Sequence, residues 1–203
     1  MSEQKETCLI SCGILRDELE RIIEKKGLEV EVNFLDASLH SDYKLLHEAL
    51  TEAIEEKLDE GQKKIILVYG DVCLGFNGEM KELVEKYGIN KVDALNCIDC
   101  LLGGKGELLE IDPDHEFFYL TPAWIDFTDL KKRDKTEARK LYSVLKGIIL
   151  IDSLGNLDHF KEEIEEISEH TGLIVLKRKN TGLVGFENLV LESIERLFKG
   201  RDK

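Results

Sequence analysis

Residues 63–75 read KKIILVYGDVCLG, and this stretch decides the fold class. Two lysines are followed by five consecutive apolar or aromatic residues, and the run ends at Gly70. Uninterrupted runs of this length are typical of strands that are covered on both faces, as in a parallel sheet. Cys73 follows the glycine by three positions. The segment therefore predicts a buried parallel strand that ends in a glycine-containing turn, with a thiol at that turn.

Apolar runs of this kind alternate with amphipathic helical patterns along the whole chain. Further strands are expected within residues 6–14, 28–38, 89–100, 116–127, 147–155 and 173–180. Strict alternation of apolar and polar residues from Leu28 to Phe34 indicates a half-buried strand at an edge of the sheet. The order of elements predicts an α/β protein, a three-layer sandwich with a mostly parallel sheet of the Rossmann-like kind.

The chain of 203 residues is expected to form a single α/β domain over residues 1–203. Residues 104–115 (GKGELLEIDPDH) come nearest to a linker. Standard nucleotide and hydrolase motifs are absent, since the chain contains no GxGxxG after its first strand, no GxxxxGK[ST] and no GxSxG. The usual sequence evidence for those activities is therefore missing.

The charge balance argues against nucleic acid and against an anionic membrane as partners. The formal net charge is −14, and the basic clusters at residues 131–133 and 177–179 are short. No apolar run is long enough to span a membrane, and the N-terminal MSEQKET does not resemble a signal peptide. We therefore expect a cytoplasmic protein, in which the odd number of cysteines, five, argues against a disulfide framework.

The five cysteines are not equivalent. Cys12, Cys73 and Cys100 each fall where a predicted strand runs out into a glycine-containing turn. Cys8 lies four residues before Cys12, about 13 Å away along a regular strand at ~3.3 Å per residue, so it is read as a core residue. Cys97 and Cys100 form a single CxxC; a redox CxxC usually opens a helix, and LLGGKG is a poor continuation for one. Cys97 is accordingly read as a core residue or as support behind the site.

Three thiols at the carboxyl edge of a parallel sheet are able to hold a metal ion or an iron–sulfur cluster with one open coordination position. Three independently buried cysteines remain the alternative. Trp124, the single tryptophan, packs in the core or covers one wall of such a site.

Several short segments resemble the DUF1638 family. They are SCG at residues 11–13, Tyr69-Gly70 followed by Cys73, DCLLG at residues 99–103 and YLTPAWI at residues 119–125. The resemblance covers roughly residues 8–160, and it implies site roles for Tyr69, Gly70, Asp99, Thr121 and Trp124 around the cysteines. The chain departs from the family pattern in the longer spacing before Cys73 and in lacking a basic residue before Asp99.

The resemblance implies anaerobes and methanogens as typical hosts, with some members encoded near corrinoid methyltransferases. A [4Fe–4S] cluster is therefore the favoured occupant of the three-cysteine site, and a zinc ion that activates a thiol for methyl transfer is the alternative. A non-catalytic accessory of a corrinoid protein is a third possibility. The expected partners are a corrinoid protein or methyltransferase and a small-molecule substrate, and the sequence does not decide whether the protein is an enzyme.

Overall fold

A computed structural model describes residues 6–127 and 134–199. Contacts divide the chain into two compact units. Unit 1 is formed by the chain up to Glu107 together with the C-terminal segment from Val184, and unit 2 is formed by Leu108–Leu183. The sequence led us to expect one domain. Each unit builds its own sheet, and the last helix returns to unit 1, which no local sequence pattern indicates.

Unit 1 contains a four-stranded parallel sheet in the order β2-β1-β3-β4. Its strands are β1 (Thr7–Cys12), β2 (Val30–Leu35), β3 (Ile65–Val68) and β4 (Asn90–Lys91). Every residue of β1 and β3 is buried, whereas β2 is mostly half-buried. The edge position predicted for the alternating segment is therefore confirmed.

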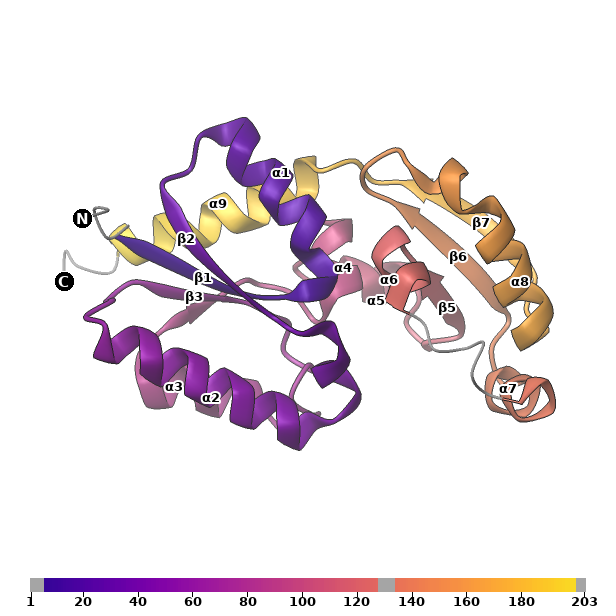
Figure 1. Ribbon diagram of the computed structural model, residues 1–203, viewed down its shortest axis with the longest axis horizontal. Coiled ribbons are helices and arrows are strands. Elements are labelled where there is room, and N and C mark those ends of the chain that lie inside the picture. The colour runs from indigo at the N-terminus through magenta and orange to yellow at the C-terminus, as the bar shows by residue number, and fades with distance from the viewer. Residues whose placement is uncertain (1–5, 128–133, 200–203) are drawn as a thin grey trace. The chain divides into compact units, whose positions relative to one another are not determined.

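Helices cover both faces of this sheet, which gives unit 1 three layers. Figure 1 shows α1 and α9 on one face, and α2 and α3 on the other. The bounds of the helices are α1 (Arg16–Lys26), α2 (Tyr43–Asp59), α3 (Glu79–Tyr87), α4 (Cys97–Leu102) and α9 (Val184–Lys199). The expected α/β class with parallel strands is thus confirmed.

The strand order creates a topological switch point between β1 and β3. The chain leaves β1 toward β2 on one side, and it later leaves β3 toward β4 on the other. In open parallel sheets a crevice forms outside the carboxyl ends of the strands where the direction of winding reverses. Here those ends are Cys12 and the segment that follows Val68.

Unit 2 contains a three-stranded parallel sheet in the order β5-β6-β7. Its strands are β5 (Phe117–Leu120), β6 (Gly147–Asp152) and β7 (Val175–Asn180). Its helices are α5 (Glu107–Ile111), which begins at the boundary, α6 (Pro122–Phe127), α7 (Lys135–Tyr142) and α8 (Lys161–Thr171). The core between this sheet and its helices includes Leu120, Leu150 and Ile167.

The fourth predicted strand is where the structure departs most from the sequence prediction. A strand was expected to run through residues 89–100, but β4 has two residues and helix α4 begins at Cys97. The side chain of Asn96 caps this helix by accepting a hydrogen bond from the Asp99 N–H, and Gly103 ends it in the left-handed conformation. Cys100 is therefore a helical residue, not the last residue of a strand.

Candidate thiol site at the carboxyl edge of unit 1

Cys12 is the last residue of β1, as predicted, and only 8% of its surface is exposed. A 3-10 turn (Gly13–Leu15) follows at once and brings the backbone N–H of Ile14 toward the thiol. Burial raises the pKa of Cys12 above its ordinary value, and the Ile14 N–H partly offsets this by favouring the thiolate. The Cys12 thiol is thus shielded from water, and the Ile14 N–H is in place to donate a hydrogen bond to its thiolate form.

The segment after β3 supplies a second thiol and a tyrosine. Tyr69 is buried, and Cys73 is partly exposed in the turn that follows Gly70. The backbone N–H of Gly70 donates a hydrogen bond of 3.3 Å to the Cys73 sulfur. Burial raises the pKa of Cys73 to about 11 despite this donor. Cys73 therefore lies in the loop beyond the strand end, where an N–H group already points at its sulfur.

The segment that leads into α4 is held directly against this loop. The N–H groups of Asp71 and Val72 donate to the carbonyls of Ala94 and Leu95, at 2.9 and 3.0 Å. This close approach requires Gly70, because a β-carbon there would lie 2.1 Å from the Leu95 carbonyl. The contact brings the α4 cysteines beside the end of β3.

Tyr69 lies among the cysteines of these three segments. Burial raises the pKa of Tyr69 well above its ordinary value, and interactions with the thiols of Cys12, Cys73 and Cys97 raise it further. Its buried hydroxyl has no hydrogen-bond partner of good geometry, although the Cys12 thiol is close enough to interact with it. The tyrosine hydroxyl is therefore available to donate to a thiolate or to a bound group.

Cys100 is fully buried and joins the same cluster from α4. Burial raises the pKa of its thiol well above the ordinary value, and Cys97 and Cys73 add to the effect. Cys97, at the start of the helix, is partly exposed. The structure thus brings Cys12, Cys73 and Cys100 to one region of unit 1, with Cys97 as a fourth thiol, whose place at the site the sequence left open.

All five cysteines are reduced and unbridged. Within residues 6–127 and 134–199, no three His, Cys, Asp or Glu side chains stand in an arrangement ready to hold a metal ion. The thiols therefore lie near one another but are not arranged to coordinate a metal ion.

Asp99 and Cys8 have structural roles. The Asp99 carboxylate is fully buried and accepts hydrogen bonds from the N–H groups of Leu95 and Gly106, at 2.9 and 3.2 Å. It thereby fixes the loops on both sides of α4. Cys8 is fully buried inside β1, as expected for a core residue, and burial raises its pKa to about 12.

Thr121 and Trp124, which the family resemblance assigned to the same site, belong to unit 2. Thr121 is buried at the end of β5, and its hydroxyl accepts a hydrogen bond of 3.2 Å from the Trp124 N–H at the start of α6. The Trp124 ring packs against the unit 2 core and edge-on against Phe127, with ring centroids 5.6 Å apart. Thr121 therefore caps α6, and Trp124 contributes to packing.

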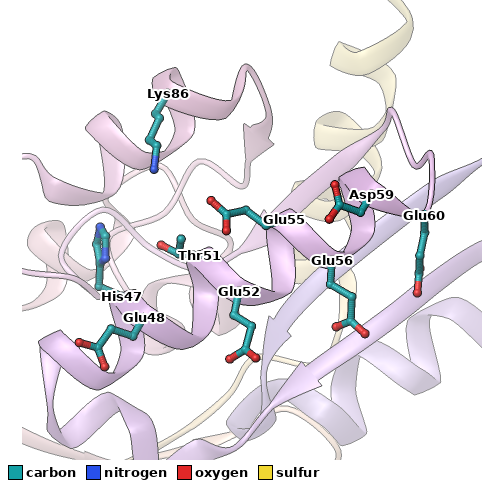
Figure 2. Close-up of a pocket in the computed structure, with 9 residues that line it drawn as sticks. All are labelled: His47, Glu48, Thr51, Glu52, Glu55, Glu56, Asp59, Glu60 and Lys86. Atoms are coloured by element: carbon teal, nitrogen blue, oxygen red, sulfur yellow. The ribbon is translucent and has the colours of Figure 1, made fainter.

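A surface groove of about 730 Å³ runs along α2 in unit 1. Figure 2 shows its lining, in which six carboxylates along and just after α2 are accompanied by His47, Thr51 and, from α3, Lys86. Clustered exposed carboxylates of this kind are well solvated and repel one another. The groove lining contains no cysteine.

Of the two basic clusters, residues 131–133 lie outside the described residues. Residues 177–179 lie on β7, where Arg178 forms ion pairs with Asp152 and Asp158.

Among the described helices, none is both long and apolar enough to cross a membrane.

The chain belongs to the DUF1638 family, described as a protein family of unknown function, whose profile matches residues 34–190. The match includes Tyr69, Cys73, Cys97 and Cys100, and it begins after Cys12. The resemblance noted in the sequence is thereby confirmed at the level of the family.

Among solved structures, the chain is similar to an ABC transporter periplasmic solute-binding protein from Actinobacillus succinogenes with bound D-allose. The two share 13% sequence identity, and the alignment covers 97% of this chain and 91% of that one with a TM-score of 0.41. A likeness at this level does not extend to the ligand. No curated protein sequence matches the chain significantly.

Proposed function

We propose that unit 1 binds a metal centre through the thiolates of Cys12, Cys73 and Cys100. The observation that carries the proposal is the position of Cys12 and of the Tyr69–Cys73 loop on either side of the switch point between β1 and β3. This is the place at which open parallel sheets bind their ligands. A buried group of soft sulfur ligands there favours iron–sulfur clusters or zinc over hard cations.

Burial keeps the three thiols protonated in the metal-free protein, but hydrogen-bond donors for a liganded form are already in place around them. The N–H of Gly70 is directed at the Cys73 sulfur, the N–H of Ile14 lies near Cys12, and the Tyr69 hydroxyl lacks a partner. Hydrogen bonds to cysteine sulfur stabilise thiolates and tune the potential of iron–sulfur clusters. A bound metal would supply the positive charge that these buried thiols need in order to lose their protons.

A [4Fe–4S] cluster is the favoured occupant, because three protein thiolates leave one iron open to a substrate or to a fourth ligand such as Cys97. Zinc bound by the same thiolates is the alternative, and it would activate a substrate thiol. The link to corrinoid methyl transfer, the accessory role and a cytoplasmic location all rest on the family resemblance and the composition. Iron with equimolar sulfide in the purified protein would support the first occupant, and zinc without sulfide the second.

Single replacements test the ligand set. Cys12→Ser, Cys73→Ser and Cys100→Ser should each lose most of the bound metal after anaerobic purification. Cys8→Ser is the matched control, because Cys8 lies on the same strand as Cys12 but inside the core. The control should retain the metal content of the wild type. Full retention by Cys12→Ser, or equal loss in all four variants, would contradict the proposal.

A further inference from the structure

We propose that Cys97 and Cys100 form a redox-active dithiol, which is oxidised to an intramolecular disulfide by small-molecule disulfides. The sequence argument against this activity was that the CxxC does not open a helix. The structure removes that argument, because α4 begins at Cys97 and Cys100 completes its first turn. The inference does not rest on the proposed metal centre, and it is tested on metal-free protein.

The backbone of α4 already has the geometry that a disulfide needs. The Cys100 N–H donates a regular helical hydrogen bond of 3.0 Å to the Asn96 carbonyl. In an α-helix, Cα atoms three residues apart are ~5 Å from each other, and their side chains share a face. Disulfides span Cα separations of roughly 4.4–6.8 Å. A bond between Cys97 and Cys100 can therefore form without displacement of the backbone.

The first turn of α4 is also held firmly in place. Asp99 fixes the loops before and after the helix through the N–H groups of Leu95 and Gly106. The Leu95 backbone is packed against Gly70, where even a β-carbon would not fit. Because the two thiols are held in one turn, the entropic cost of bringing them together is small.

The two thiols differ in accessibility in the way that thiol–disulfide exchange requires. Cys97 is partly exposed and able to meet an external disulfide, whereas Cys100 is fully buried and shielded from one. The Cys97 thiolate attacks one sulfur of the reagent, so that a mixed disulfide forms and one thiolate leaves and takes up a proton. The Cys100 sulfur then attacks the Cys97 sulfur and its proton passes to the departing thiolate, so that the protein disulfide forms and the second thiol is released.

In the complete reaction the protein dithiol loses two electrons and two protons. One small-molecule disulfide takes them up and becomes two thiols. The step withdraws Cys97 from the thiols near Tyr69 and joins it to Cys100. A small disulfide is the fitting reactant, because Cys97 is only partly exposed and Cys100 is buried.

Peptide mapping tests the inference directly. Trypsin places the cysteines in three separate peptides, residues 6–16, 65–81 and 92–105. Reduced, metal-free protein is treated with glutathione disulfide without oxygen, quenched in acid and digested. In the wild type, residues 92–105 should appear as a single peptide two hydrogens lighter. A cross-link between that peptide and residues 65–81 or 6–16, or an unchanged peptide, would overturn the proposal.

Two variants test the order of the steps. Cys100→Ser should stop the reaction at the first step, which leaves one glutathione on residues 92–105, and Cys97→Ser should leave that peptide unmodified. Cys8→Ala, a core replacement in another peptide, should form the same disulfide as the wild type. Circular dichroism confirms that each variant is folded, and Cys100→Ala repeats the trapping test if the buried serine disturbs the fold. Absence of the adduct in both folded Cys100 variants contradicts Cys97 as the attacking thiol.

Discussion

Gly70 and Leu95 are in such close contact that a β-carbon on Gly70 would lie 2.1 Å from the Leu95 carbonyl. This contact couples the loop that carries Tyr69 and Cys73 to the turn that carries Cys97 and Cys100. Tyr69 and Cys73 precede Cys97 and Cys100 by more than twenty positions in the sequence. The two segments approach each other closely because Gly70 has no side chain.

Gly70→Ala should therefore destabilise the protein by at least ~1–3 kcal/mol, the usual cost of forcing an extra group into a packed site. Chemical denaturation measures this cost. Gly27→Ala is the control, because its β-carbon meets no atom within 4 Å and reports only the cost of a left-handed backbone. We also expect Gly70→Ala, but not Gly27→Ala, to increase the alkylation rate of Cys100. An unchanged rate in Gly70→Ala would mean that the contact does not position α4.

Asp99→Asn should cost ~1–3 kcal/mol, because an amide that replaces the buried carboxylate cannot accept from two N–H groups as strongly. Asp112→Asn is matched to it, since the buried Asp112 carboxylate accepts from the N–H groups of Glu116 and Phe117 in unit 2. Both variants should lose stability in urea. Only Asp99→Asn should change the reactivity of Cys97, and equal reactivity in both variants would contradict the positioning role of Asp99.

Tyr69→Phe should leave the metal-free protein as stable as the wild type, or more stable by up to ~1 kcal/mol, because the lost hydroxyl has no partner. Tyr119→Phe provides the contrast, since the Tyr119 hydroxyl donates to Asp112 at 3.3 Å and its loss should cost stability. Once metal is bound, Tyr69→Phe should release it faster than the wild type does. A marked loss of stability in metal-free Tyr69→Phe would show that its hydroxyl is already engaged.

Cys8 should make stability depend on alkaline pH. Its pKa is raised from 9.0 to about 12, mainly by burial and further by Glu31. Above about pH 9 the unfolded chain loses this proton while the folded protein keeps it, so stability falls as the pH rises. The stability of the wild type relative to Cys8→Ala, measured by denaturation at several pH values, should decline over this range. A difference that stays constant from neutral pH upward would contradict the raised pKa.

The sequence was sufficient for the strands that define the sheet of unit 1. The apolar run at residues 65–69 and the alternating segment at residues 28–34 behave as predicted, because burial on two faces and on one face leave different patterns. The positions of Cys12 and Cys73 follow from β1 and β3, since the ends of neighbouring parallel strands meet at one edge of the sheet.

Helix α4 was missed because a short, mostly apolar segment such as CIDCLL at residues 97–102 does not distinguish a short helix from a strand. A local signal was present. Asn96 and Asp99 have the spacing of a helix N-terminal cap, and Gly103 stands where a helix ends. The division into two units left no such signal, because it depends on α9 packing with the first half of the chain.

The metal content of protein purified without oxygen tests the central claim most directly. Iron, sulfide and zinc are measured per chain in the wild type and in Cys12→Ser. The account predicts iron with an equal amount of sulfide in the wild type, and little of either in the variant. Wild-type protein that holds neither iron nor zinc, even after anaerobic reconstitution with iron and sulfide, would contradict a metal centre at these thiols.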